Sequence, residues 1–454
     1  MLVDAWLARA EESHPDRVAL ETPDGCCSYT KLLEKAQACA VELTKRGAQR
    51  GQRVAIALPA GLDFAYALHA CLLLGAIAVP VDLRMSAAEQ QRIADGASVL
   101  VDRPLDGSHR PADSQELSGD HALARSHDLD APAIVIHTSG TSSAPKPIEL
   151  TYGNLLWSAL GSAVALGLDE NERWLCALPL SHVGGLSIIV RSAIYGTTAV
   201  IHERFETERV LRALQEERIT LVSLVATTLA RVLDAGLSDP PALRCALTGG
   251  GPVPSALVER ATAAGVPVST TYGLTESCSQ VTTAPIAALA QHDHGPGPAL
   301  FCTRVRCAED GEILVAGPTV APDALAENGW LHTGDLGALD AQGRLSVTGR
   351  KADTIVSGGE NVAPSEVEAV LETHPDVLEA AVVGREDPEW GEAVTAIVVL
   401  RVTPSLRVKC STDEAALRAH CAAALAPYKV PKRVLLREES LPRTRSGKLL
   451  RREL

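Results

Sequence analysis

The sequence predicts an α/β protein with a large N-terminal domain and a small C-terminal domain. Short apolar runs alternate with helical patterns over more than half of the chain, which is typical of mixed, largely parallel sheets covered by helices. The 454 residues are enough for two or three domains on length alone. A hydrophobic content of 46% and a charged content of 22% are those of a soluble globular protein.

The predicted strands of the large domain are short apolar runs, as expected for strands buried on both faces. The longest apolar run, Phe64 to Val81, contains Gly75 and Pro80 and is short for a membrane span of about 20 residues. We interpret it as a helix followed by a strand, and we expect no transmembrane segment. The predicted strands are 54–58, 76–81, 133–136, 173–178, 198–202, 221–224, 242–247 and 266–271, and helices such as 36–46, 62–74 and 209–216 lie between them.

The pattern changes near Gly311, where GEILVAG and GRLSVTG predict a β-rich, hairpin-containing subdomain. A compact α+β domain of about 100 residues follows. We expect helices over 364–374 and 412–424 and strands over 379–383 and 393–400. The predicted domains are 1–350 and 351–454, and the polar stretch 102–130 is predicted to be a surface excursion.

Charge and cysteine content narrow the classes of function. A formal charge of −14 argues against a nucleic-acid partner, although 432–452 is locally basic and could be a solvated face or a polyphosphate contact. Eleven cysteines without a C-x-x-C pair indicate reduced thiols. The N-terminus has no secretory signal pattern, so we expect a cytoplasmic protein. The sequence leaves open whether the protein forms a homo-oligomer.

The stretch HTSGTSSAPKPIELT, from His137 to Thr151, suggests a phosphate-binding loop. Small residues let the backbone approach an anion, and their N–H and hydroxyl groups can surround it. Lys146 would add a positive charge. The spacing is not that of the common P-loop, and a polar surface loop remains the alternative.

Further candidates follow other predicted strands. Gly249–Gly251 ends one strand and Tyr272–Glu276 another, which suits a crevice at the carboxyl edge of a sheet. Tyr272 could stack on a base and Glu276 could hold Mg²⁺, but a core tyrosine and a solvated glutamate are the ordinary alternatives. Asp335 could accept from ribose hydroxyls, and Lys448 lies on a Gly-containing segment near the C-terminus.

Taken together, these motifs resemble the adenylate-forming superfamily of acyl-CoA ligases, peptide-synthetase adenylation domains and beetle luciferases. The chain is most similar there to the 2-succinylbenzoate–CoA ligase branch of menaquinone synthesis, through LPLSHVGGLSIIVRSAIYG, LTGGGPVP and TYGLTESCSQVTT. The superfamily motifs occur in order and span most of the chain: the loop 138–147, TYGLTE at 271–276, HTGDLG at 332–337, GRKADTIVSGGENVAPSEVE at 349–368 and LPRTRSGKLLR at 441–451.

The resemblance implies a two-step, ATP-dependent acid–thiol ligase. A carboxylate of a small-molecule acid, 2-succinylbenzoate, attacks the α-phosphorus of MgATP, and coenzyme A then displaces AMP after the small domain rotates about Ala352. Lys448 would stabilise charge at phosphorus in the first step. His182 would lie near the carboxylate and the thioester tunnel, or be an ordinary turn histidine.

The same resemblance implies the binding residues. One carboxylate of succinylbenzoate reacts, and the other needs polar partners. Arg191, the cationic candidate for it, could instead be a surface ion pair. The implied nucleotide ligands are Thr138, Ser139, Gly140, Thr141, Ser142 and Lys146 for the β- and γ-phosphates, Thr275 for the α-phosphate, Glu276 for Mg²⁺, Tyr272, Gly273, Gly249, Gly250 and Gly251 for adenine, and Asp335 and Arg350 for ribose. Gly358 and Gly359 would shape the pantetheine channel. The residues implied to bind the acid are Arg191, Ser277, Ser279, Gln280 and Thr283, with Gly185 and Leu186 against its ring.

Three departures from the family pattern concern phosphate binding. Ser143 stands where relatives usually have Gly, and Pro147 stands where they usually have Gly or Ala. Arg445 stands where relatives often have a small residue. Two other functions stay open, and Ser143 and Pro147 prompt the second of them. The chain could activate another aryl or short acyl acid, or it could be a non-catalytic nucleotide-binding relative.

Overall fold

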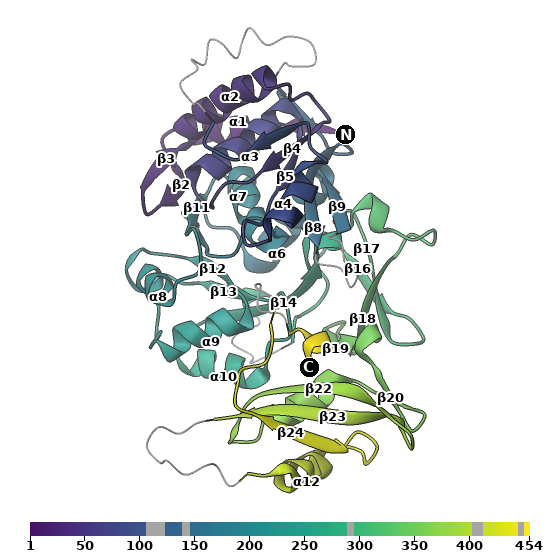
Figure 1. Cartoon of the computed structure of the whole chain (residues 1–454). Coiled ribbons are helices and arrows are strands. Elements are labelled where there is room, and N and C mark those ends of the chain that lie inside the picture. Colours follow the sequence, from purple (N-terminus) through teal and green to yellow (C-terminus); the bar gives the residue numbers. More distant parts are fainter. Residues whose placement is uncertain (106–122, 139–145, 288–294, 402–411, 444–448) are drawn as a thin grey trace. The chain divides into compact units, whose positions relative to one another are not determined.

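The computed structural model describes residues 1–105, 123–138, 146–287, 295–401, 412–443 and 449–454. The chain divides into two compact units. The first comprises 1–305 and 315–331, and the second comprises 306–314 and 332–454 (Figure 1). The predicted α/β class is confirmed. The predicted boundary at residue 350 remains a prediction.

An eight-stranded sheet forms the centre of the first unit. Its order is β15-β14-β13-β12-β10-β11-β2-β3, and the strands from β14 to β2 are parallel. The strands β11, β12 and β13 are buried at every residue, because helices cover both faces of a parallel sheet. Bounds are β2 Val18–Thr22, β3 Gly25–Ser28, β10 Arg173–Cys176, β11 Thr198–Ile201, β12 Leu221–Leu224, β13 Cys245–Thr248, β14 Val268–Leu274 and β15 Ser279–Thr283.

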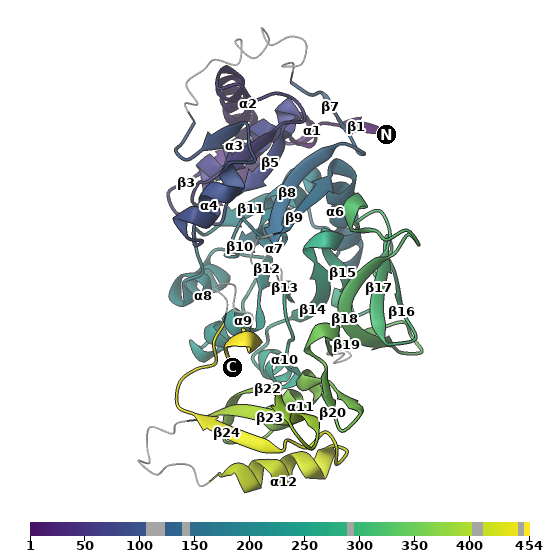
Figure 2. The same ribbon diagram turned by 45° about the vertical axis from the view of Figure 1, so that its right-hand side comes forward.

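A five-stranded sheet of order β6-β4-β5-β8-β9 forms the second layer of this unit. Its last pair, β8 and β9, is antiparallel and the others are parallel (Figure 2). A separate antiparallel pair joins β1 to β7. Bounds are β1 Leu2–Asp4, β4 Arg53–Ile56, β5 Ile77–Pro80, β6 Val99–Val101, β7 Ser126–Asp128, β8 Pro132–Thr138 and β9 Lys146–Thr151.

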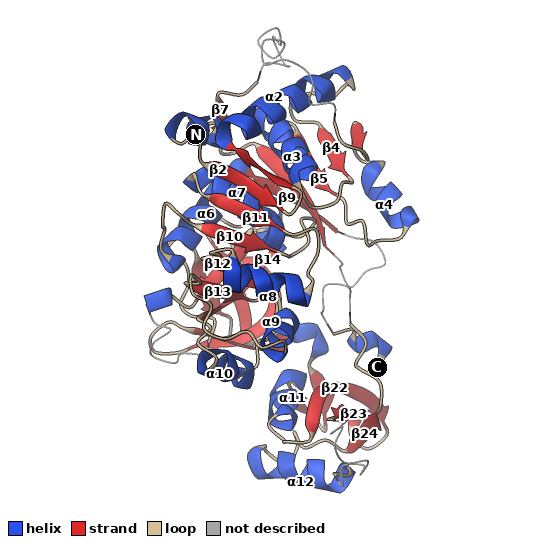
Figure 3. Cartoon of the chain, turned by 90° about the vertical axis from the view of Figure 1, so that its left-hand side faces the viewer, coloured by secondary structure: helices blue, strands red, loops and turns tan. Residues whose placement is uncertain are grey.

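Helices pack around the strands of this unit (Figure 3). Helices α3 and α7 bury residues on nearly every side, so each lies inside the layers. Among the described residues, no helix is long and apolar enough to cross a membrane. Bounds are α1 Trp6–Ser13, α2 Tyr29–Lys45, α3 Leu62–Leu74, α4 Ala87–Ala94, α6 Tyr152–Leu166, α7 Val183–Tyr195, α8 Thr207–Glu216, α9 Ala226–Asp234, α10 Ser255–Ala263, and the 3₁₀ turns η2 Thr275–Ser277 and η4 Pro322–Ala324.

The later part of the chain is β-rich, as predicted. One sheet has four strands in the order β16-β17-β18-β19. A second sheet has the order β21-β20-β23-β22, with β24 paired to β23. The apolar faces of α11 and α12 pack with this second sheet in one core. Bounds are β16 Arg304–Cys307, β17 Glu312–Ala316, β18 Leu331–Leu339, β19 Leu345–Arg350, η5 Lys351–Asp353, β20 Ile355–Ser357, β21 Glu360–Val362, α11 Pro364–Glu372, β22 Val377–Asp387, β23 Gly391–Leu400, α12 Glu414–Ala424, β24 Arg433–Arg437 and η6 Arg451–Glu453.

The prediction of a surface excursion over 102–130 is wrong at its end. Ser126–Asp128 forms β7, and His127 within it is buried. The imidazole of His127 stacks on Tyr152 with ring centroids 4.4 Å apart and accepts the backbone N–H of Trp6. These partners are distant in sequence, so the polar composition of the stretch concealed a core position.

Two buried histidines of this core make stability depend on pH. Burial lowers the pKa of His69 and of His127 to about 4, whereas an unfolded histidine titrates near 6.5. Both side chains are therefore neutral when folded. As the pH falls from 6.5 toward 4, the histidines of the unfolded chain bind protons while those of the folded chain do not. The free energy of unfolding therefore decreases over this range.

We expect urea unfolding at pH 5.5 to give a free energy lower than at pH 7.5 by about 1 kcal/mol for each of these histidines. The variant His69→Gln should show a correspondingly smaller pH difference. His332→Gln is the matched control, because His332 is 46% exposed. An unchanged pH difference in His69→Gln would contradict this interpretation.

Candidate active site

The ends of the predicted phosphate loop are paired across an antiparallel hairpin. Thr138 and Lys146 are partners in the β8–β9 register, and Thr138 Oγ1 donates to the Lys146 carbonyl at 3.3 Å. Pro147 lies in β9, opposite His137, and β9 is the edge of its sheet. An edge strand tolerates the missing N–H of proline. The predicted ligands Ser139, Gly140, Thr141 and Ser142, and also Ser143, lie outside the described residues.

The glycine cluster lies beside β14, as the sequence predicts. Strands β13 and β14 are parallel neighbours, so Gly249 follows one strand directly beside the other. A Cβ on Gly249 would lie 2.7 Å from the Thr271 carbonyl oxygen, and Gly250 has a φ of +77°. Tyr272 is half-buried, so its ring is not a fully enclosed core group. The backbone of 249–251 is therefore held close to the strand that carries Tyr272.

The turn after β14 is held by close packing and by hydrogen bonds. A Cβ on Gly273 would lie 1.6 Å from the Ser279 carbonyl oxygen, so only glycine fits there. Ser277 Oγ donates to the Leu274 carbonyl at 3.0 Å and accepts its N–H at 3.1 Å. The Glu276 carbonyl accepts the Ala321 N–H at 2.8 Å. These contacts fix the 3₁₀ turn η2, which carries Thr275 and Glu276.

Beyond η2 the backbone is strained. Cys278 and Ser279 have positive φ angles of 53° and 94°, and such values are uncommon outside glycine. The predicted acid-binding residues Ser277, Gln280 and Thr283 are buried here. Gln280 Nε2 donates to Thr283 Oγ1 at 2.8 Å. The segment from Ser277 to Thr283 is therefore polar, largely buried and held in one conformation by its contacts.

Arg191 is buried, so the alternative of a surface ion pair is wrong. It is 2% exposed, and its Nη2 donates to Ser158 Oγ at 2.9 Å. Ser158 Oγ in turn donates to the Cys278 carbonyl at 2.6 Å. The guanidinium lies 5.6 Å from the centre of the Trp174 ring, and burial lowers its pKa.

No acidic side chain among the described residues pairs with Arg191, and its Nε has no partner there. A buried cation without a counter-charge is costly. This environment suits a group that receives an anionic ligand.

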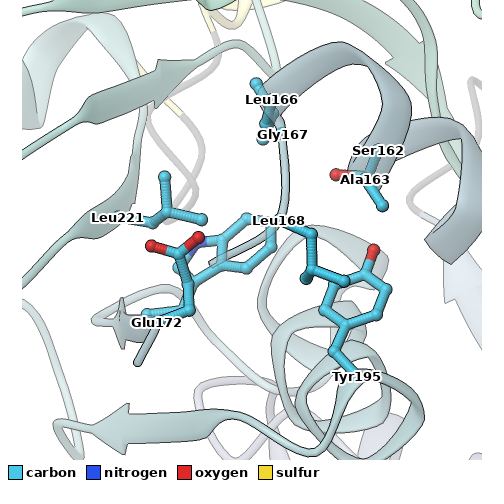
Figure 4. Close-up of a pocket in the computed structure, with 9 residues that line it drawn as sticks. Ser162, Ala163, Leu166, Gly167, Leu168, Glu172, Tyr195 and Leu221 are labelled. Carbon is cyan, nitrogen blue, oxygen red and sulfur yellow. The ribbon is translucent and has the colours of Figure 1, made fainter. Parts of the chain in front are cut away.

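A small hollow lies close to this region, and Trp174 is among its lining residues. Figure 4 shows the hollow with its other lining residues labelled. Leu166, Leu168 and Tyr195 also line it. None of the predicted site residues does, so we assign it no part in the reaction.

His182 precedes α7 and contacts two residues that the sequence analysis missed. Arg84 Nη2 lies 3.1 Å from His182 Nε2, and Arg84 pairs with Asp82 at 2.6 Å. Because a guanidinium only donates, Nε2 must be the unprotonated nitrogen. Burial and then Arg84 lower the pKa of His182. Asp82 and Arg84 follow the end of β5, and this position after a predicted strand is the feature of the sequence that could have identified them as site residues.

The segment that precedes α7 packs closely against this helix. Gly185 in α7 has no room for a side chain, since a Cβ would lie 2.5 Å from the Pro179 carbonyl oxygen. Leu186, the other residue predicted to contact the acid ring, is buried. Both therefore fix the position of α7 against the LPLS segment.

Asp335 and Arg350 come together across the β18–β19 hairpin of the second unit. They are register partners, and Arg350 Nε lies 2.7 Å from Asp335 Oδ1. Asp335 is buried, whereas Arg350 is 42% exposed. The hairpin is braced by Glu312, which accepts the Gly334 N–H at 3.0 Å and pairs with Lys351 at 3.2 Å. Glu312 was also missed by the sequence analysis.

The remaining predicted site residues lie later in the second unit. Gly358 and Gly359 connect β20 to β21, and both have positive φ, of 60° and 86°. A Cβ on Gly358 would lie 3.0 Å from the Trp390 ring. Lys448 lies outside the described residues, and so does Arg445.

Comparison with known proteins defines the class. Residues 7–323 match the AMP-binding enzyme family, and residues 366–448 match the AMP-binding enzyme C-terminal domain. The chain therefore belongs to the AMP-binding enzyme family, and the resemblance seen in its motifs is confirmed.

Similar curated proteins include two bacterial ligases. The 2-succinylbenzoate–CoA ligase of Bacillus subtilis (strain 168) is 36% identical, covering 99% of this chain and 97% of that protein. A ligase of the same name from Bacillus cereus (strain ATCC 14579) is 37% identical with the same coverage.

Solved structures are similar over the whole chain. The o-succinylbenzoate CoA synthetase from Bacillus subtilis, in complex with its acyl-adenylate intermediate, has a TM-score of 0.87 and 35% identity, covering 100% of this chain and 98% of that one. The same enzyme in complex with ATP and a magnesium ion has a TM-score of 0.87 and 34% identity, with both chains covered completely.

We expect Gly273→Ala to reduce ATP–pyrophosphate exchange by about a hundredfold or more, because its Cβ must displace the Ser279 carbonyl and with it η2. Gly96→Ala is the matched control, since its Cβ would meet nothing closer than 3.7 Å. Exchange within about threefold of the wild type in Gly273→Ala would contradict the assigned role of this turn.

Proposed function

We propose that this chain activates 2-succinylbenzoate with MgATP and transfers the acyl group to coenzyme A. The observation that carries the proposal is end-to-end similarity to 2-succinylbenzoate–CoA ligases, at 36–37% identity over 99% of the chain. The substrate-side segment from Ser277 to Thr283 supports it, because it is polar and largely buried.

Three elements would hold the nucleotide. The β8–β9 hairpin places Thr138 and Lys146 together, at the base of the segment proposed to bind the β- and γ-phosphates with Ser139–Ser142. Gly249–Gly251 and Tyr272 would line the adenine slot, with Thr275 at the α-phosphate. Asp335 would accept the ribose hydroxyls, with Arg350 holding its carboxylate in place.

The residues present fit a magnesium ion. Glu276 sits on η2 with its backbone fixed by Ala321, and its carboxylate has no hydrogen-bond partner among the described residues. Hard cations prefer carboxylate and phosphate oxygens and keep several waters, so one protein carboxylate is sufficient. When bound, Mg²⁺ would neutralise charge on the phosphates.

The acid would lie against α7 and β15. Arg191 offers a buried positive charge with no acidic partner among the described residues, which suits the carboxylate that does not react. Ser277, Ser279, Gln280 and Thr283 would supply hydrogen bonds. His182, whose pKa burial and Arg84 lower, would lie near the reacting carboxylate, and its protonated Nδ1 is the nitrogen that can donate to it.

The two steps would use one site in turn. A carboxylate oxygen attacks the α-phosphorus, the bond to pyrophosphate breaks, and Lys448 stabilises the developing charge. Residues 351–454 would then rotate about Ala352 and bring Gly358 and Gly359 to the pantetheine channel. The thiol sulfur attacks the acyl carbon and the bond from that carbon to the AMP oxygen breaks. AMP leaves with this oxygen and the bonding electrons, and the thiol proton is released. We place this activity in the cytoplasm.

A screen of carboxylic acids tests the proposal. With the full chain, MgATP and coenzyme A, pyrophosphate release should be fastest with 2-succinylbenzoate, and a thioester should accumulate only when coenzyme A is present. Faster turnover with another aryl or short acyl acid would assign the chain a different substrate. Absence of exchange with every acid would contradict a ligase function.

Arg191→Gln should raise the KM for 2-succinylbenzoate by about tenfold or more and leave the KM for ATP within about twofold, because charge-assisted hydrogen bonds to a carboxylate are lost. Arg260→Gln, an exposed arginine paired with Asp234, is the control. Equal effects on both KM values would remove Arg191 from the acid site.

A further inference from the structure

The turn after β5 carries a closely held ion pair. Arg84 donates to Asp82 through Nε at 2.8 Å and through Nη2 at 2.6 Å, so the guanidinium makes a two-pronged contact with the carboxylate. The backbone N–H of Arg84 also donates to Asp82 Oδ1, at 3.0 Å. Such a contact fixes direction as well as distance. Asp82 therefore sets the way in which the guanidinium of Arg84 points.

The backbone of this turn is itself fixed. The Val81 N–H donates into β4 at 2.9 Å, and the Met85 N–H closes the turn by donating to the Asp82 carbonyl at 3.0 Å. On the far side of the turn, Gln90 Nε2 of α4 donates to the Met85 carbonyl at 2.8 Å. The turn thus holds Asp82 and Arg84 at a defined place beside the end of β5.

The guanidinium of Arg84 also reaches His182, which is 98 residues away in the sequence. Arg84 Nη2 lies 3.1 Å from His182 Nε2. Because Nη2 carries two hydrogens, it can donate to Asp82 and to His182 at once. The backbone of His182 is fixed as well, since its carbonyl accepts the N–H groups of Gly185 and Leu186 at the start of α7.

This contact decides which nitrogen of the ring carries the proton. A neutral imidazole has one N–H and one bare nitrogen, and the hydrogen bond made at one nitrogen determines the state of the other. Arg84 can only donate, so Nε2 of His182 is bare and Nδ1 carries the proton. Within the part of the chain that the structure describes, Nδ1 makes no hydrogen bond, and the His182 side chain is 39% exposed. The Nδ1–H group is therefore available to a ligand.

The two charges of the turn act on the His182 ring in opposite directions. Burial and then Arg84 lower the pKa of His182, whereas Asp82 raises it. Among the described residues, these are the charged groups that act on the ring. Asp82 Oδ2 lies 3.8 Å from His182 Nε2. Without Arg84, the carboxylate would attract a proton to Nε2, and Nδ1 would become the bare nitrogen.

We propose that Arg84, held by Asp82, is a positioning residue that keeps the proton of neutral His182 on Nδ1 and fixes the direction of that N–H. The inference rests on the proposed function, because it takes His182 as the histidine beside the reacting carboxylate. The Nδ1–H group would donate to a carboxylate oxygen and orient it. A bare Nδ1 would repel the same oxygen, since both atoms carry lone pairs.

The first test determines the tautomer directly and needs no substrate. In the full chain labelled with ¹⁵N histidine, the signals of His182 are those that disappear in His182→Gln. At about pH 7.5 their nitrogen chemical shifts should show the Nδ1–H tautomer in the wild type and mainly the Nε2–H tautomer in Arg84→Met. The matched control is Arg92→Met, which removes an exposed arginine that bonds only its own helix, through Nε and the Ala88 carbonyl. It should leave the signals of His182 unchanged.

A pH titration of the same signals separates an effect of charge from a general loss of structure. The protonation midpoint of His182 should move to higher pH in Arg84→Met and to lower pH in Asp82→Asn, because the two variants remove opposite charges. Arg84→Lys retains the charge and a donor, so it should preserve the midpoint and the Nδ1–H tautomer. If Arg84→Met does not fold, Arg84→Gln also removes the charge and should raise the midpoint.

The kinetic test measures pyrophosphate release without coenzyme A. Arg84→Met should lower kcat/KM for 2-succinylbenzoate by about tenfold and leave the KM for ATP within about twofold, because a hydrogen bond to a charged group is lost. His182→Gln should cause a similar loss. The double variant should lose no more than either single variant, because both changes act through one side chain.

The outcomes distinguish this inference from the proposed function. An Nε2–H tautomer in the wild type, or the same tautomer and midpoint in Arg84→Met, would overturn the role of Arg84 whatever acid the enzyme uses. Midpoints that move in the same direction in Arg84→Met and Asp82→Asn would also overturn it, and so would additive losses in the double variant. The expected tautomers together with no turnover of 2-succinylbenzoate by the wild type would support the tautomer assignment and contradict the proposed function.

Discussion

The close approach of Gly273 to the Ser279 carbonyl is the constraint on which the candidate site depends. The carbonyl oxygen occupies the space that any side chain would need, so β14 and β15 can meet at this distance only through glycine. The chain therefore reverses within a few residues. That reversal places Thr275 and Glu276 at the end of one strand and the polar residues of β15 immediately beside them.

The turn is strained, and its surroundings hold it. Positive φ at Cys278 and Ser279 persists only where neighbouring contacts determine the conformation. Ser158 supplies one such contact by donating to the Cys278 carbonyl, and Arg191 holds Ser158. Ala321 supplies another at Glu276. A buried arginine can thus brace the turn and, on the proposed function, still offer its remaining donors to a carboxylate.

Much of this arrangement could be predicted from the sequence. The apolar runs that became β12 and β13 were clear because strands buried on both faces are continuously apolar. The Gly249 and Tyr272 clusters were expected at neighbouring strand ends, and they lie there. Asp335 and Arg350 were expected at a hairpin, and they pair across it.

The parts that escaped prediction depend on partners distant in sequence. His127 is buried because Trp6 and Tyr152 enclose it, and β9 forms because β8 pairs with it despite Pro147. Ser158 carries no motif at all, and its role follows only from its two neighbours in space. Local composition cannot report such contacts.

The central claim is that a carboxylate oxygen attacks the α-phosphorus of ATP on this platform. The most direct measurement uses 2-succinylbenzoate labelled with ¹⁸O in its carboxylates, followed by mass analysis of the products after thioester formation. The account predicts one ¹⁸O atom in each AMP and none in pyrophosphate. Label in inorganic phosphate or pyrophosphate, with unlabelled AMP, would contradict it.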